Sequence, residues 1–265
     1  MTSPMSRSLG GGSYLRKCLV CGYPITAHSH ALTAHEEECL NGKAKIMSGT
    51  ITIPVGKVAV ELLCAGDAIA RMTANSKAWE PETRSIWHTL INEGEGVIDV
   101  GAYTGVYSIA SAMLGARVLA LEPHPVNYVR LRDNAAINST RIRMLEAAAS
   151  NHKGNRILYS KRNATEICDT ASLDTQQAVA IRVSTVRLDD LMPEGRVCLI
   201  KIDTEYHECD VIRGAFDLLA RDHPNVIAEI LNPQERVRVS CLLAMIGYKW
   251  RCVLDGRNHL YIGGD

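Results

Sequence analysis

A glycine-rich turn between an apolar strand and a helix constrains this chain more than any other feature. It lies in the stretch Val97-Ile-Asp-Val-Gly-Ala-Tyr-Thr-Gly, with glycines at positions 101 and 105. Glycine permits positive φ and lets a ligand approach the main chain closely. The N–H groups that begin the following helix can bind a polar or anionic group. The Asp-x-Gly-x-x-x-Gly spacing differs from the common dinucleotide and phosphate-loop patterns. The turn therefore predicts a ligand site without deciding which cofactor binds there.

Short apolar runs alternate with helical patterns after this turn, which predicts a doubly wound α/β fold with a mostly parallel sheet. A hairpin is expected over residues 51–63, and residues 151–178 read as polar and irregular, with a strand end at Tyr159. One helix is expected to run from residue 211 to 219, and Asp255-Gly256 is typical of the turn of a closing antiparallel pair. The predicted strands are 97–100, 117–121, 142–145, 181–186, 197–202, 226–230, 248–254 and 259–262, and further helices are expected from Trp79, over 127–138 and over 236–246.

Acidic residues stand where three of these strands end. Asp99, Glu122 and Asp203 would meet at one edge, because ligands of such sheets bind outside the carboxyl ends of the strands. A carboxylate at the end of the second strand, here Glu122, can accept hydrogen bonds from two ribose hydroxyls. The sequence thus predicts a nucleoside-containing ligand at this edge.

Composition restricts the class of protein. The 265 residues suffice for one sizeable domain with an appendage, and 46% hydrophobic with 22% charged residues is typical of a globular chain. Lys+Arg and Asp+Glu both number 29, so no global basic field favours nucleic acid. Apolar runs are too short for a membrane span, and the N-terminus has no secretory signal. Six cysteines scattered singly are expected to be reduced, so we expect a cytoplasmic location. The oligomeric state is not determined.

The N-terminal region has the spacing of a zinc site. Cys18, Cys21, His35 and Cys39 form Cys-x2-Cys-x13-His-x3-Cys, with the last two ligands on one face of an expected helix. We predict a flexible leader over residues 1–17, a zinc-finger-like module over 18–45 and the main domain over 50–265. The alternative is a chance grouping in a cysteine-rich chain. Such a module could be structural, dock a protein or bind nucleic acid.

Several ordered stretches resemble the FkbM family of S-adenosylmethionine-dependent methyltransferases. Together they span about residues 79–248, in the order and spacing of the family. One position departs from the family pattern Lys-Ile-Asp-x-Glu-Gly-x-Glu, because Tyr206 stands in place of the glycine. The matching stretches are Val97-Ile-Asp-Val-Gly-Ala-Tyr-Thr-Gly, Ala120-Leu-Glu-Pro-His-Pro-Val-Asn, Val186-Arg-Leu-Asp-Asp-Leu, Ile200-Lys-Ile-Asp-Thr-Glu-Tyr-His-Glu, Arg213-Gly-Ala and Ala228-Glu-Ile.

The resemblance implies a Rossmann-like class I methyltransferase fold with a seven-stranded sheet, and S-adenosylmethionine as methyl donor. It implies transfer to a hydroxyl on a small molecule or saccharide, with a general base among Asp203, Glu205, His207 and Glu208, of which Asp203 and His207 are favoured. Lys201 reads rather as a structural partner of a carboxylate, and a divalent metal held by Asp203 and Glu229 stays an open alternative. The cofactor-binding residues it implies are Glu80, Asp99, Gly101, Ala102, Thr104, Gly105, Glu122, Asn127, Ala147 and Asp203.

Competing interpretations remain for these residues and for the function. Glu205 and Glu208 could simply favour a helix N-terminus, and His207 could be an exposed helix residue. The acceptor could be a nucleic acid or protein, with the zinc module as recognition element. A third interpretation is a cofactor-binding module without chemistry. The Asn/Asp-Pro-Pro-aromatic motif of amino-methylating DNA enzymes is absent, which weakens the DNA-base interpretation.

Overall fold

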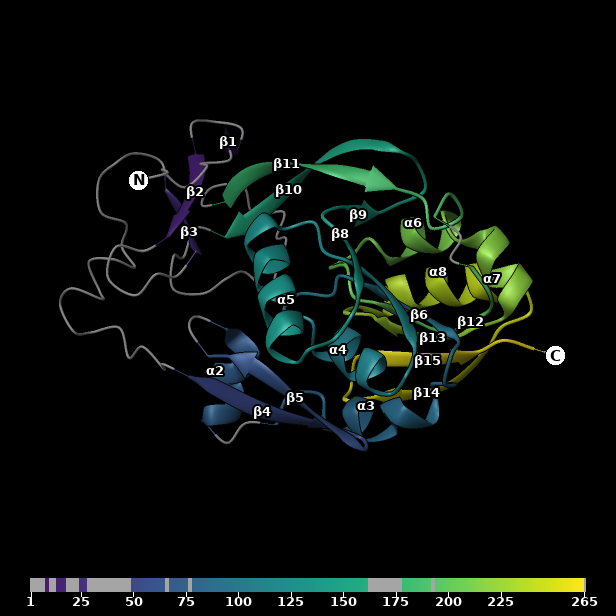
Figure 1. Ribbon diagram of the computed structural model, residues 1–265. Coiled ribbons are helices and arrows are strands. Elements are labelled where there is room, and N and C mark those ends of the chain that lie inside the picture. The colour runs from purple at the N-terminus through teal and green to yellow at the C-terminus, as the bar shows by residue number, and fades with distance from the viewer. Residues whose placement is uncertain are drawn as a thin grey trace.

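The centre of the computed structural model is a seven-stranded sheet with the order β14-β15-β13-β12-β6-β7-β8 (Figure 1). The structure describes residues 8–9, 13–17, 24–27, 49–64, 67–75, 78–161, 178–191 and 194–264. The predicted, mainly parallel α/β sheet is confirmed. The parallel strands are β6 (Gly96–Val100), β7 (Arg117–Leu121), β8 (Arg143–Leu145), β12 (Val197–Ile202) and β13 (Asn225–Glu229), and β15 (Asn258–Ile262) and β14 (Lys249–Leu254) close the sheet antiparallel.

Both faces of the sheet are covered, because successive side chains of each buried strand point to opposite faces. Val97 packs into one apolar cluster, and its neighbour Ile98 packs into another. The Val97 face is covered by β4 (Thr50–Val55), β5 (Val58–Leu63), α2 (Ala68–Ala74), α3 (Pro81–Ile86), the 3-10 helix η1 (Trp87–Thr89), α4 (Val106–Met113) and α5 (Pro125–Ile137). The Ile98 face is covered by α6 (Glu208–Arg213), α7 (Phe216–Asp222) and α8 (Pro233–Ala244).

A second sheet of order β10-β11-β9 arches over one edge of the molecule (Figure 1). Its strands are β9 (Ala148–Ala149), β10 (Gly154–Lys161) and β11 (Ala178–Val186). A strand end was predicted at Tyr159 within an otherwise irregular segment. The structure instead has a regular strand, β10, which pairs with β11 along its whole length from Gly154↔Thr185 to Lys161↔Ala178. A strand rich in polar residues is not recognisable from its sequence pattern. Its regularity comes from backbone pairing with a distant segment rather than from an apolar pattern of its own.

The helix expected over 211–219 is two helices, α6 and α7, with a break at Gly214. A Cβ atom at Gly214 would collide with the carbonyl oxygen of Ser150, so the chain needs glycine where this turn meets the β9 segment. The Gly214 carbonyl accepts a hydrogen bond from the Asp189 N–H at 2.9 Å, which further ties the break to a neighbouring turn.

Three short strands in the N-terminal region form an antiparallel sheet, namely β1 (Ser8–Leu9), β2 (Ser13–Lys17) and β3 (Pro24–Ala27). The first two lie within residues 1–17, where a leader without regular structure was expected; backbone pairing does not require the apolar periodicity that is missing there. The predicted zinc ligands Cys18, Cys21, His35 and Cys39 lie outside the described residues. Over the residues that are described, no helix has the length and apolar character to cross a bilayer.

Candidate functional site

A cavity of about 570 Å³ opens at the carboxyl ends of β6, β7, β12 and β13, roofed by β10 and β11. Its volume suits a cofactor-sized ligand. Ten of the predicted site residues line it, while Thr104, Gly105 and Glu208 do not. The predicted residues in the lining are Glu80, Asp99, Gly101, Ala102, Glu122, Asn127, Ala147, Asp203, Glu205 and His207.

The turn between β6 and α4 brings main chain against main chain. Gly101 has φ 78°, and a Cβ atom there would collide with the backbone carbonyl oxygen of Asp203. The N–H groups of Gly101 and Ala102 both donate to the Leu121 carbonyl oxygen, at 2.9 and 3.0 Å. Glycine at position 101 therefore sets how closely β6 and β12 approach at the cavity floor.

Thr104 and Gly105 shape this turn from behind rather than face the cavity. Thr104 is fully buried, and its carbonyl oxygen accepts a hydrogen bond from Asn134 Nδ2 at 2.8 Å. Gly105 has φ 94°, and a Cβ atom there would collide with the Leu131 side chain of α5. Both residues are therefore placed to hold α5 against the turn, and neither lines the cavity.

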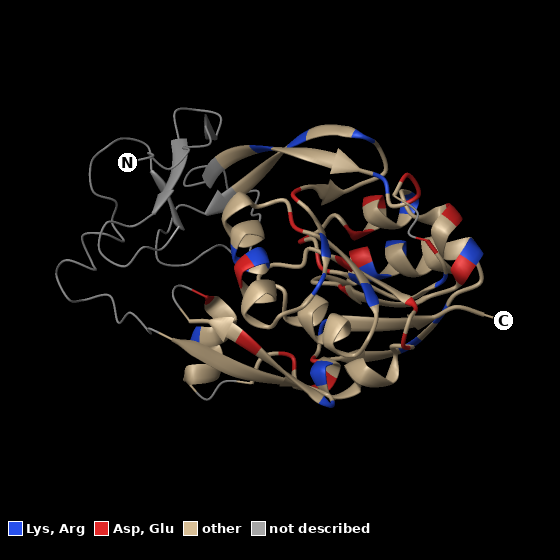
Figure 2. Ribbon diagram, viewed as in Figure 1, with Lys and Arg blue, Asp and Glu red and all other residues tan. Residues whose placement is uncertain are grey.

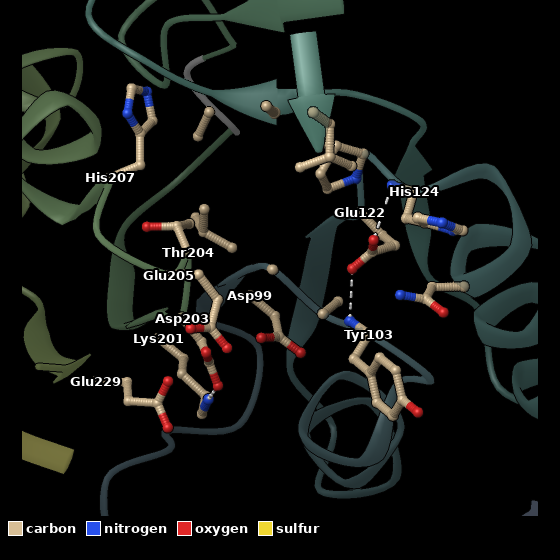
Figure 3. A pocket seen from close by; sticks show the side chains of 18 of the residues that line it. Asp99, Tyr103, Glu122, His124, Lys201, Asp203, Thr204, Glu205, His207 and Glu229 are labelled. Carbon is tan, nitrogen blue, oxygen red and sulfur yellow. Dashed lines mark hydrogen bonds and ion pairs between the residues drawn. The ribbon is translucent and has the colours of Figure 1, made fainter. Parts of the chain in front are cut away.

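Glu122, at the end of β7, is held by the main chain on both of its oxygens (Figure 3). Oε2 accepts from the Tyr103 N–H and Oε1 from the His124 N–H, each at 2.8 Å. Burial raises the pKa of Glu122 to about 8, despite these hydrogen bonds and one from Asn127. The buried Oδ1 atom of Asn127 has no hydrogen-bond partner and faces the same cavity. These two side chains offer acceptors to a ligand that carries hydroxyl or amino donors.

Asp99, at the end of β6, accepts a hydrogen bond from Ser108 Oγ at 2.6 Å, and burial raises the pKa of its carboxyl. Glu80 precedes α3 and accepts from Tyr107 Oη at 2.7 Å, while the Tyr107 ring packs on Trp87 with centroids 4.2 Å apart. Both carboxylates are thereby held in fixed orientations toward the cavity.

Two ion pairs lie at the ends of β12 and β13. One joins two residues at the end of β12, and the other joins the turn between β14 and β15 to the end of β13. Lys201 Nζ lies 2.5 Å from Asp203 Oδ2, and Arg257 Nε lies 2.9 Å from Glu229 Oε1. Burial opposes ionisation of Asp203, but the Lys201 ammonium, hydrogen bonds from Glu229 and Lys201 and the Arg257 charge together lower the pKa of the carboxyl. Burial and the Asp203 charge raise the pKa of Glu229 to about 9. The prediction that Lys201 partners a carboxylate is confirmed.

Carboxylate oxygens of Glu80, Asp203 and Glu229 lie within 4.8 Å of one another, a donor set that resembles a divalent-metal site. Lys201 and Arg257 already contact these carboxylates and would repel a metal ion placed among them. The residues present therefore do not fit a divalent metal.

His207 lies toward the β9–β10 segment, apart from the acidic group around Asp203 (Figure 3). Its Nε2 is 3.1 Å from Ser150 Oγ, and its Nδ1 is 3.6 Å from Asp210 Oδ2. Burial lowers the pKa of His207, against the opposing charge of Asp210. The imidazole is thus neutral at neutral pH and able to accept a proton.

Glu208, predicted as a candidate base, is 2% exposed and turned into the protein. Its Oε1 accepts from Thr204 Oγ1 at 3.0 Å, from the Tyr206 N–H at 3.2 Å and from the Thr204 N–H at 3.3 Å. A carboxylate with three donors from one loop is placed to hold that loop.

This loop carries two successive residues with positive φ, Glu205 at 53° and Tyr206 at 76°. The FkbM-like pattern has glycine at position 206, and the left-handed φ observed there gives a physical reason for it. The chain keeps the backbone path of a glycine while presenting a tyrosine.

Residues 99–248 match the protein family described as the methyltransferase FkbM domain, which is more than half of the chain. The chain belongs to the FkbM methyltransferase family. A Streptomyces tacrolimicus protein named 31-O-demethyl-FK506 methyltransferase FkbM is 28% identical, over 53% of this chain and 66% of its own length.

Two solved structures are similar to this FkbM-family chain. Methyltransferase FkbM from Methylobacillus flagellatus has a TM-score of 0.46 at 15% identity, covering 74% of this chain and 60% of that one. A T. thermophilus 16S rRNA methyltransferase in complex with AdoMet and guanosine has a TM-score of 0.48 at 13% identity, covering 82% and 50%. The chain spans less than two thirds of the length of each of these relatives.

The FkbM match includes Asp99, Glu122 and Asp203, but part of the cavity comes from outside it. Arg257 reaches the site from the turn between β14 and β15, and Glu80 from the start of α3. Arg156, which lies within the match, joins from β10. Sequence reasoning missed Arg156 and Arg257, because neither belongs to a motif and only the fold brings them to the sheet edge.

Proposed function

We propose that this chain is an S-adenosylmethionine-dependent methyltransferase that methylates a hydroxyl of a small molecule or saccharide. The observation that carries the proposal is Glu122, a buried carboxylate held by two backbone N–H groups at the edge of the cavity beside the Gly101 turn. Family membership supports methyl transfer, and the name of the Streptomyces relative supports a hydroxyl acceptor.

The residues of the donor side fit a nucleoside-containing methyl donor. Glu122 keeps lone pairs that can accept hydrogen bonds from the two ribose hydroxyls, and Asn127 Oδ1 can accept one from an amino group of the base. Gly101 lines the cavity, and its positive φ lets the chain turn there beside the end of β12. When bound, the donor supplies an electrophilic methyl group on its sulfonium.

His207 is the favoured base on the acceptor side. Asp203 is paired with Lys201 and has a lowered pKa, which makes it a weak proton acceptor. His207 is neutral and lines the cavity. Its Nδ1 lies beside Asp210, and its Nε2 contacts the Ser150 hydroxyl. A hydroxyl that took the place of Ser150 Oγ at Nε2 would lose its proton to that nitrogen as its oxygen bonds to the methyl carbon and the bond between that carbon and the sulfonium sulfur breaks. The protein's other task is to hold the hydroxyl oxygen in line with the sulfonium methyl.

The charges around the cavity favour a neutral acceptor over a nucleic acid. Each of the three cations in the described lining has a carboxylate partner, in the pairs Lys201–Asp203, Arg257–Glu229 and Arg156–Asp210. Figure 2 shows both basic and acidic residues on much of the described chain, whereas the β10–β11 strands carry basic residues alone. Phosphate backbones are bound by unpaired Lys and Arg side chains.

A methyl-transfer screen tests the function directly. S-adenosylmethionine with a radiolabelled methyl group is offered with saccharide, small-molecule, nucleic-acid and protein pools. We expect label in the saccharide or small-molecule pool, strongly reduced by Glu122→Gln and unaffected by Glu146→Gln, an exposed glutamate outside the cavity. Label confined to nucleic acid or protein would contradict the proposal.

A further inference from the structure

The loop after β12 has a backbone conformation that its own side chains disfavour. Glu205 and Tyr206 both have φ in the left-handed region, at 53° and 76°. Residues other than glycine, asparagine and aspartate are uncommon in this region. The Cβ atom of a bulky side chain would approach the neighbouring carbonyl oxygen too closely. Conformations of this kind persist only where the surroundings impose them, and they concentrate at functional sites.

Glu208 is the group that imposes this conformation. Its buried Oε1 accepts hydrogen bonds from Thr204 and from the N–H of Tyr206 itself. The carboxylate therefore holds the backbone on both sides of Glu205 and sets the direction in which the Tyr206 side chain leaves the chain.

The Tyr206 ring is not buried in the protein, so its packing does not offset the backbone strain. It is 56% exposed, although it lines the cavity, so the ring stands at the cavity opening. A side chain retained there for stability alone would be buried, and glycine would serve the backbone better. The ring is available to a ligand.

Groups near the ring define what such a ligand would be. Arg156 and His207 also line the cavity, and both have Asp210 as a partner. Thr204 also lines the cavity, and its hydroxyl donates a hydrogen bond to Glu208. An aromatic face beside hydrogen-bonding groups and without an unpaired cation in the described lining suits a neutral ring that carries hydroxyls, and it does not suit a polyphosphate.

We propose that Tyr206 is the acceptor-recognition residue, whose ring stacks on the C–H face of a pyranose ring and sets one of its hydroxyls at the methyl donor. The inference rests on the proposed function, because it names the acceptor class of the same site. Glu208 is a positioning residue, since it acts through the loop that carries Tyr206.

Saturation-transfer NMR with a defined panel of probes tests the stacking without requiring turnover. The probes are the methyl pyranosides of glucose, galactose, mannose and rhamnose, each with and without S-adenosylhomocysteine. We expect saturation to reach the ring C–H protons of at least one pyranoside with the unmodified protein. Tyr206→Phe should retain the effect, whereas Tyr206→Ala and Tyr206→Gly should raise the Kd about tenfold.

Controls and outcomes are distinct. Trp250→Ala removes another half-exposed aromatic ring, far from the cavity lining, and should leave the Kd unchanged. The inference is overturned if no pyranoside receives saturation, or if binding survives in both Tyr206→Ala and Tyr206→Gly. A pyranoside that binds through Tyr206 but gains no label from radiolabelled S-adenosylmethionine would instead reject the proposed function and leave the binding assignment standing.

Discussion

At the scale of single residues, the most informative position is Tyr206, where a tyrosine occupies a backbone conformation that suits glycine. Its φ of 76° predicts that the free energy of unfolding will be about 1 kcal/mol higher for Tyr206→Gly than for Tyr206→Ala. Only alanine pays the steric cost of a left-handed backbone conformation. Urea denaturation of the two variants measures this difference, and both have lost the same ring. Equal stabilities would show that the loop relaxes to negative φ when the ring is removed.

Glu122 predicts a pH dependence at the same scale. Its pKa is raised by burial to about 8 in the folded protein, so the folded state binds the proton more tightly than the unfolded chain does. The free energy of unfolding should therefore fall as pH rises from about 4.5 to 8, with a slope of up to about 1.4 kcal/mol per pH unit from this group.

Denaturation across pH 5 to 8 in the absence of cofactor measures this slope, and Glu122→Gln should remove its share. Glu229 contributes with the same sign, since its pKa is raised to about 9, so a residual slope is expected in the variant. An unchanged slope in Glu122→Gln would contradict a raised pKa at position 122.

At the scale of elements, the loop after β12 depends on one carboxylate at the start of α6. Glu208→Ala leaves the Thr204 and Tyr206 donors without their acceptor and should cost about 1–3 kcal/mol. We expect faster hydrogen exchange at the amides of residues 204 and 206, measured by NMR. Glu208→Gln keeps an acceptor oxygen and should retain most of the protection. If the alanine variant exchanged at the same rate as the unmodified protein, the loop would not depend on Glu208 for its conformation.

The break between α6 and α7 gives a second prediction for an element. Gly214→Ala introduces a Cβ that collides with the Ser150 carbonyl oxygen, and overpacking against backbone should destabilise the protein by about 1–3 kcal/mol. Gly154→Ala is the matched control, because its nearest neighbour is 3.6 Å away and its φ is not positive. Thermal unfolding compares the two variants. Equal midpoints would show that the Cβ at position 214 does not collide with the Ser150 carbonyl oxygen.

At the scale of the whole molecule, the cavity edge joins elements from most of the described chain, so a ligand there should stabilise the fold. S-adenosylmethionine at about 100 times its Kd should add about 2.7 kcal/mol to the free energy of unfolding and raise the midpoint by several degrees. Differential scanning fluorimetry measures the shift, which should shrink in Glu122→Gln at the same ligand concentration. No shift in the unmodified protein would reject this methyl donor.

The sequence by itself determined the mainly parallel sheet and the edge at which the cavity lies. Strands 117–121 and 197–202 agree with β7 and β12 at both ends, because each is an apolar run with charged or polar residues beside it. Glycine at position 101 and the acids at the strand ends are local signals, since a tight turn and a strand end are set by neighbouring residues.

Only the tertiary structure decided how the proposed acceptor side of the cavity is built. It brought Arg257 and Arg156 to the cavity, removed Glu208 from it and placed the Tyr206 ring at its opening. The physical reason is that these roles depend on pairing and burial between segments far apart in the chain, and on a φ angle that no local pattern specifies. The turn at Gly101 is specified by its own residues, whereas the proposed acceptor surface forms only when segments far apart in the chain come together.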